Sequence, residues 1–148
     1  MKSLILATII AALWPLSSAT AHDARASEWF KFATTEVIVH PDPAGGRVAR
    51  GVQFTSFRSD LQYGDGHQER VTGECSSMVA NTFTQVGVCV APGVYVLNFR
   101  CQATPAASGS SCWGRLTGDL AGHHNGLTGQ VTYHVTAEGI TGVGNWDY

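Results

Sequence analysis

Glycine recurs at short intervals in the last third of the chain, and this spacing constrains the fold more than any other feature. Between Cys112 and Val135, glycine stands at positions 114, 118, 122, 126 and 129, and apolar residues alternate with polar ones from Val131 to Val135. Glycine at this density opposes helix formation, and a two-residue apolar period is typical of strands. The pattern therefore predicts short strands that approach one another closely, as in a small barrel or sandwich.

Turn signals divide the rest of the chain into segments of strand length. Two prolines and two glycines fall within residues 41–46, and further turns are indicated at 63–66 and 91–93. Residues 28–34 are also compatible with one helical turn. The segments predicted as strands are 28–40, 47–58, 67–79, 82–90, 94–101, 112–118, 127–137 and 139–147.

Two of these strands carry explicit predictions about their buried faces. In the most apolar segment, 94–101, side-chain alternation puts one set of residues on a common face: Tyr95, Leu97, Phe99 and Cys101. In segment 82–90 the apolar side chains favoured for the core are Phe83, Val86 and Val88.

Seven or eight short strands without an amphipathic helix predict an all-β domain. The spacing suits a sandwich or a closed antiparallel barrel of about eight strands. Closure pairs every strand on both sides and leaves no free edge, which favours the barrel for an exported protein.

The first 21 residues are predicted to be a signal peptide. Lys2 precedes an apolar run, Leu4–Leu13, and Ala19-Thr-Ala21 supplies a small-x-small cleavage site. A second cleavage site after Ala26 and an uncleaved anchor helix are the alternatives. Cleavage after Ala21 leaves residues 22–148 as one domain, secreted or periplasmic, with no membrane attachment.

Four cysteines lie in the mature part of the chain, which fits two disulfides formed in an oxidising compartment. Three connectivities are possible. We favour Cys75–Cys89 with Cys101–Cys112, because each pair brackets one connection between predicted strands. No Cys-x-x-Cys motif occurs, which argues against a cysteine-based zinc site.

The charge pattern and the titratable residues indicate little chemistry. The net charge is −2, without a Lys/Arg cluster, which excludes nucleic acid as a partner. Adjacent strand residues point to opposite faces, so no metal or cofactor is predicted, and the histidines are expected at an exposed turn and on a polar strand face. The metal candidates weighed were His123, His124 and His134. Carboxylates at Asp60, Asp65, Glu69 and Glu74 are expected to be solvated, and no catalytic residue is assigned.

The tail also resembles a known group. The runs Cys112-Trp-Gly-Arg-Leu-Thr-Gly118, Gly126-Leu-Thr-Gly129 and Gly142-Val-Gly-Asn-Trp146 are similar to small secreted bacterial proteins of the allene oxide cyclase-like or dirigent-like barrel group. The resemblance implies an eight-stranded, calycin-like or allene oxide cyclase-like barrel. The matching residues are structural glycines and aromatics, so it implies a fold and no activity.

Three hypotheses of function follow. The first is a binding or structural module that holds a small apolar ligand inside the barrel. The second is a cyclase or isomerase with its site in the barrel mouth, and the third is an inhibitor or other protein that binds a protein partner through its loops. Phe54 is a further candidate for the interior, and the residues predicted to line a ligand site are Tyr95, Phe99, Trp113, Tyr133 and Trp146.

Overall fold

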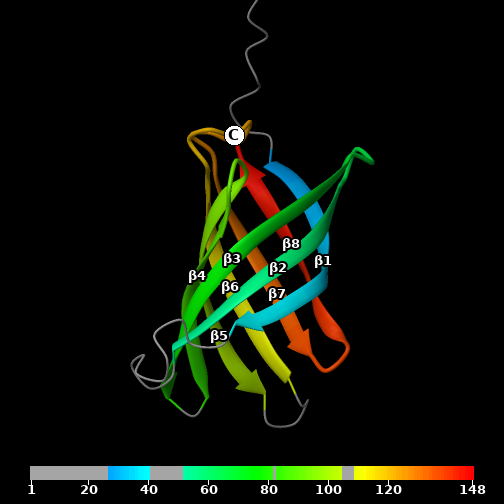
Figure 1. Cartoon of the computed structure of the whole chain (residues 1–148). Coiled ribbons are helices and arrows are strands. Elements are labelled where there is room, and N and C mark those ends of the chain that lie inside the picture. The colour runs from blue at the N-terminus through cyan, green and yellow to red at the C-terminus, as the bar shows by residue number, and fades with distance from the viewer. Residues whose placement is uncertain (1–26, 41–51, 82, 105–108) are drawn as a thin grey trace, which may run out of the picture.

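A computed structural model of the chain describes residues 27–40, 52–81, 83–104 and 109–148, and these residues form one closed antiparallel barrel (Figure 1). Each strand pairs with its neighbours in sequence, and β1 pairs with β8 to close the sheet. The predicted fold class is confirmed. The predicted signal peptide and residues 47–51 of the predicted second strand lie outside the described residues. The strands are β1 (Ser27–His40), β2 (Val52–Tyr63), β3 (Gln68–Asn81), β4 (Thr84–Ala91), β5 (Tyr95–Thr104), β6 (Gly109–Gly118), β7 (Thr128–Thr136) and β8 (Gly139–Asp147).

β1 is one long strand, so the alternative of a helical turn over residues 28–34 is wrong. Its pairing with β2 shifts between Thr34 and Glu36, where one extra residue forms a β-bulge. The bulge changes which residues face inward: Thr34 lines the interior before it, and Val37 lines the interior after it. β1 thereby keeps a row of side chains inside the barrel along its whole length.

The strand that follows the turn at residues 91–93 has the expected orientation. In β5, Tyr95, Leu97 and Cys101 are buried on the inner face, as predicted. β4 has the opposite register from the one predicted. Gln85 and Cys89 face the interior. Val86 and Val88 occupy the intervening positions and so belong to the outer face. Phe83, also predicted for the core, is 55% exposed. The disulfide at Cys89 fixes this orientation, because side chains two residues apart in a strand share a face.

Both disulfides join neighbouring strands at directly opposite positions. Cys75 in β3 pairs with Cys89 in β4, and Cys101 in β5 pairs with Cys112 in β6. This is the favoured connectivity of the three. The two bridges fit a protein of an oxidising compartment. No helix in the described ranges has the length and hydropathy needed to cross a membrane.

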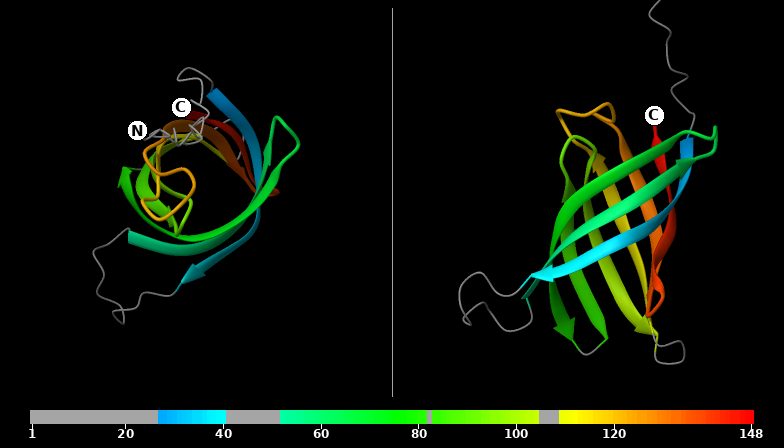
Figure 2. Two further views of the ribbon diagram at one scale, coloured as in Figure 1. Left: turned by 90° about the horizontal axis from the view of Figure 1, so that it is seen from above. Right: turned by 45° about the vertical axis from the view of Figure 1, so that its right-hand side comes forward.

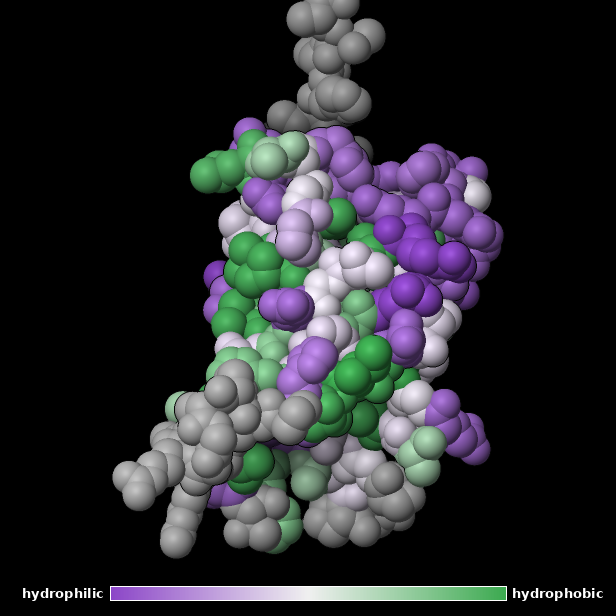
Figure 3. Space-filling model, in the orientation of Figure 1, coloured by the Kyte–Doolittle hydropathy of each residue, from purple (hydrophilic) through white to green (hydrophobic). Residues whose placement is uncertain are grey.

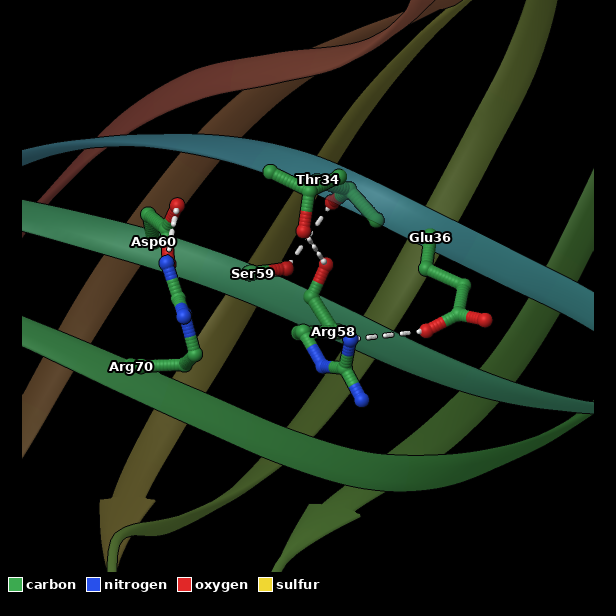
Figure 4. Close-up of polar contacts among 7 residues, drawn as sticks. Thr34, Glu36, Arg58, Ser59, Asp60 and Arg70 are labelled. Atoms are coloured by element: carbon green, nitrogen blue, oxygen red, sulfur yellow. Dashed lines mark hydrogen bonds and ion pairs between the residues drawn. The ribbon is translucent and has the colours of Figure 1, made fainter.

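The outer surface of the barrel mixes charged pairs with apolar side chains. Arg58 contacts Glu36 at 3.2 Å, and Arg70 contacts Asp60 at 2.6 Å, each pair joining two adjacent strands (Figure 4). Exposed apolar side chains include Ile38 of β1, Met78 of β3 and Val90 of β4, and on the face that Figure 3 shows apolar and polar surface alternate. Exposed ion pairs of this kind each contribute about 0–1 kcal/mol, so the interior and the disulfides dominate the stability.

The two ends of the barrel differ. One end carries the turns β2–β3 and β4–β5 and the longer loop 119–127, which folds across the barrel axis in the view from above (Figure 2). We call it the loop end. The other end, where β1 stops at His40 and β2 starts at Val52, is called the far end.

Candidate functional site

The barrel encloses a cavity of about 230 Å³. Its wall is largely apolar and takes side chains from every strand, including Leu97, Leu116 and Val131. An engineered apolar cavity of about 150 Å³ holds one benzene molecule, so this cavity has room for a larger guest. The aromatic members of the wall are Phe30, Phe32, Phe57, Tyr95, Phe99 and Tyr133.

Aromatic rings of the cavity wall pack against glycines on the neighbouring strand. At Gly87, for example, an added Cβ would fall 2.7 Å from the ring of Phe99, its partner across the β4–β5 ladder. The ring of Phe99 therefore occupies the space that a side chain at Gly87 would need. The register pairs of this type are Phe30–Gly144, Phe32–Gly142, Phe57–Gly73 and Phe99–Gly87.

Polar groups in the wall form two pairs. Thr34 on β1 and Ser59 on β2 are hydrogen-bonded through their hydroxyls at 2.9 Å (Figure 4). Gln85 on β4 donates from Nε2 to the hydroxyl of Ser77 on β3 at 2.7 Å. Paired in this way, these groups do not have to be satisfied by a guest, although a hydroxyl can still accept a further hydrogen bond from one.

The cavity reaches solvent at the far end. Leu61 and Leu116 in the wall nearer the loop end are each 3% exposed. Val37 and Val39, in the wall nearer the far end, are 47% and 57% exposed although they face inward. An inward-facing side chain that is half-exposed must meet solvent within the barrel, so a guest would enter from this end.

The structure places the predicted ligand residues in three environments. Tyr95, Phe99 and Tyr133 line the cavity, while Trp146 is fully buried but lies outside the cavity wall. The prediction for Trp113 is wrong: it is 45% exposed and contacts Arg100 on the outer surface, because Cys112 beside it faces inward. Phe54 also lies outside the cavity wall. A ligand-binding role for the inward residues stays a prediction.

A polar cluster closes the loop end. His124, from loop 119–127, is 3% exposed, and its ring stacks on Trp146 with centroids 4.4 Å apart and planes at 15°. Tyr63 donates a hydrogen bond to Oε2 of Glu69 at 3.0 Å, and its hydroxyl oxygen lies 3.4 Å from Nε2 of His124. The adjacent ring of His123 has its centroid 3.9 Å from that of His124.

The loop that carries the histidines is fixed by its own contacts. Asp119 accepts hydrogen bonds from the backbone N–H of Gly93 at 2.7 Å and of Ala121 at 3.1 Å, which ties the loop to the β4–β5 turn. At Gly118 an added Cβ would lie 1.7 Å from the carbonyl oxygen of His124, so the loop can fold back this closely only over a glycine.

Burial and charge shift the pKa values in the cluster. Burial raises the pKa of Tyr63, and the nearby Glu69 carboxylate raises it further. The pKa of His124 is lowered, chiefly by burial and then by His123, although Glu69 acts in the opposite direction. Hydrogen bonds from two backbone amides lower the pKa of the Asp119 carboxyl. Tyr63 and His124 are therefore both neutral at neutral pH.

This polar cluster was not predicted from the sequence. Glu69, predicted to be solvated, turns inward with a side chain that is 16% exposed, and His124, predicted to be exposed, is buried. His123 is exposed as expected, and His134 lies away on β7, where it contacts Ser111. One signal was present: Glu69 and Val71 alternate with the charged Arg70, which places both on one face of β3.

The polar cluster is separate from the cavity. Leu61 and Phe30 line the cavity, while Tyr63 stands one inward position beyond Leu61, about 7 Å along the strand. Of the described residues, none of Tyr63, Glu69, His124 or Trp146 belongs to the cavity wall.

Fold and site together define a closed eight-stranded barrel with an apolar internal cavity, covered at one end by a histidine-bearing loop. Comparisons of the chain with protein-family models, with curated proteins and with solved structures found no match.

Proposed function

We propose that this protein is an exported binding module that holds one small apolar ligand inside its barrel. The observation that carries the proposal is the 230 Å³ cavity with its largely apolar wall. Most cores are packed without voids larger than a water molecule, so a cavity of this size calls for an occupant. Export is supported by the apolar N-terminal run, Leu4–Leu13, and by the two disulfides.

The volume sets the size of the ligand. Scaled from one benzene in about 150 Å³, the cavity holds about nine non-hydrogen atoms. Aromatic contacts favour a flat guest: Tyr133 meets Phe32 and Phe99 edge to face, with ring centroids 6.0 Å and 6.3 Å apart. The proposed ligand class is therefore a one- or two-ring aromatic, or a branched aliphatic of similar size.

A size series tests this proposal directly. Calorimetric titration of the mature protein with indole, whose size matches the estimate, is expected to give saturable one-to-one binding. Benzene is expected to bind more weakly because it leaves part of the cavity unfilled, and the three-ring anthracene is expected not to bind. NMR shift changes on adding indole should centre on Phe99 and Tyr133. Absence of saturable binding by every member of the series would refute the proposal.

The enzyme hypothesis is the second candidate, and one observation favours it. Glu69 and His124 face inward beside Tyr63, and the pKa values of His124 and Tyr63 are shifted. A cyclase or isomerase needs such groups in contact with its substrate. Here they stand behind the cavity wall, which favours binding without chemical conversion as the proposed function.

Membership of the allene oxide cyclase-like or dirigent-like barrel group is also a proposal. Its support is the eight-stranded closed barrel together with the glycines and tryptophans of β6, β7 and β8. A protein partner bound through the loops is the third candidate, and the indole titration distinguishes it, because a loop-mediated function requires no guest in the cavity.

A further inference from the structure

The loop end of the barrel brings together three side chains that are metal ligands in other proteins. Glu69 comes from the start of β3, and His123 and His124 come from loop 119–127. One ligand atom from each of the three lies within 4.8 Å of the other two. Residues more than fifty positions apart in sequence thus converge, which neither the His-His pair nor the carboxylate alone indicates.

The distances within this cluster are too long for direct hydrogen bonds. Nε2 of His123 lies 3.8 Å from Oε1 of Glu69, and Nε2 of His124 lies 3.8 Å from Oε2 of the same carboxylate. A hydrogen bond between nitrogen and oxygen spans about 2.7–3.2 Å. Two imidazoles therefore face one carboxylate across a gap that no direct hydrogen bond closes.

The gap suits a bridging cation. Zinc bonds to nitrogen and oxygen are about 2.1 Å long, and at tetrahedral angles they put two ligand atoms about 3.4 Å apart. The two nitrogen–oxygen distances of 3.8 Å run to different oxygens of Glu69. An ion would therefore take both oxygens after shifts of a few tenths of an ångström, or one oxygen after a turn of the carboxylate. Two histidines and one carboxylate are also a common donor set for zinc with an open fourth position.

The surroundings hold the ligands in place without a metal. His124 is fixed by stacking on Trp146, and Tyr63 fixes the carboxylate by donating to its Oε2. Among the described residues, none donates a hydrogen bond to Oε1 of Glu69, so this oxygen is open to an ion. The hydrogen bond from Tyr63 to the other oxygen is of the type that orients ligating carboxylates in metal sites. His123, with a 61% exposed side chain, leaves a route from solvent.

We propose that Glu69, His123 and His124 bind one zinc ion that links loop 119–127 to β3 at the loop end of the barrel. The site differs from the expectation that the chain takes no metal, and it does not depend on the proposed ligand in the cavity. The ion would keep one position for water or for an exogenous anion. Its structural effect is to fasten the sealed end of the barrel.

Zinc binding to untagged, chelator-treated mature protein tests the proposal. Calorimetry and elemental analysis after dialysis are expected to give one zinc per chain, and added zinc should raise the melting temperature. Cobalt, used as a spectroscopic substitute, should give the visible bands of a four-coordinate ion. The variants His123→Ala and Glu69→Gln should no longer bind one zinc per chain.

Two further variants make the result specific. His134→Ala removes a histidine outside the cluster and is expected to bind zinc like the wild type. Tyr63→Phe keeps all three ligands but removes the hydrogen bond to Glu69, so zinc should bind about 10–100-fold more weakly. His123 is exposed, so His123→Ala should remain folded, which circular dichroism checks. Wild-type protein that binds no zinc, or equal losses in His134→Ala and His123→Ala, would overturn the proposal.

Discussion

The substitution Thr55→Phe should abolish ligand binding by filling the cavity from its own wall. Thr55 lies in the cavity wall on β2, between Val39 on β1 and Cys75 on β3. A phenyl ring needs about the 150 Å³ that benzene occupies in an engineered cavity. The six ring atoms replace the two outer side-chain atoms of Thr55, a net gain of four atoms or about 100 Å³. Of the 230 Å³ present, about 130 Å³ would remain, which is space for about five non-hydrogen atoms.

The loss of affinity follows from the atoms that can no longer be buried. About nine buried atoms at roughly 0.8 kcal/mol each give at most about 7 kcal/mol, which corresponds to a Kd on the order of 10 µM. Excluding about four of them removes roughly 3 kcal/mol, a loss of more than a hundredfold. Indole should therefore show no saturation with the Thr55→Phe protein.

Calorimetric titration with indole is the assay, and Thr132→Phe is the matched control. Thr132 is exposed on β7, where the same change adds the same ring outside the barrel. The control should bind indole like the wild type, and the melting temperature of Thr55→Phe should not fall, because the new ring enters existing space. Unchanged indole affinity in folded Thr55→Phe would refute the reasoning that the cavity is the binding site.

Three other substitutions have expected outcomes. Asp119→Asn should lower the free energy of unfolding at neutral pH, because folding depresses the pKa of the Asp119 carboxyl. The difference between wild type and variant should disappear as the pH falls below about 3.9, measured by urea unfolding at several pH values. The double change Cys101→Ala, Cys112→Ala should cost about 3 kcal/mol in the same assay, and indole at a hundredfold excess over its Kd should restore about 2.7 kcal/mol. Phe99→Ala should uncover Gly87, lower stability by up to about 3 kcal/mol and let the three-ring anthracene bind, read out by calorimetry.

The barrel itself could be predicted because local signals agreed with one another. Turn residues separated the strands, and alternation correctly assigned the inner face of β5. The prediction for the buried face of β4 was wrong because its valines do not face the interior. The inward positions of β4 hold Gln85, Gly87 and Cys89. Their tertiary partners, Cys75 in the disulfide and the ring of Phe99 over Gly87, show which face is inward.

The polar cluster could not be predicted, since it depends on how a loop folds over the barrel end. Strand alternation predicts that adjacent side chains diverge, but His123 and His124 lie in a turn and share one side. Their convergence with Glu69 requires the close approach of the loop over Gly118, which is a tertiary feature. The sequence supplied the glycine and the histidines without the geometry that relates them.

The cavity and the two disulfides are linked through stability. A void costs about 24 cal/mol per Å³ in mutational series, so a 230 Å³ cavity forgoes roughly 5–6 kcal/mol relative to a filled core. Bridges that span 14 and 11 positions each contribute about 3 kcal/mol, together about 6 kcal/mol. The two terms are of equal size and opposite sign. A barrel of this length can therefore stay hollow because its wall is cross-linked, and three of the four cysteines, Cys75, Cys89 and Cys101, lie in the wall of the cavity itself.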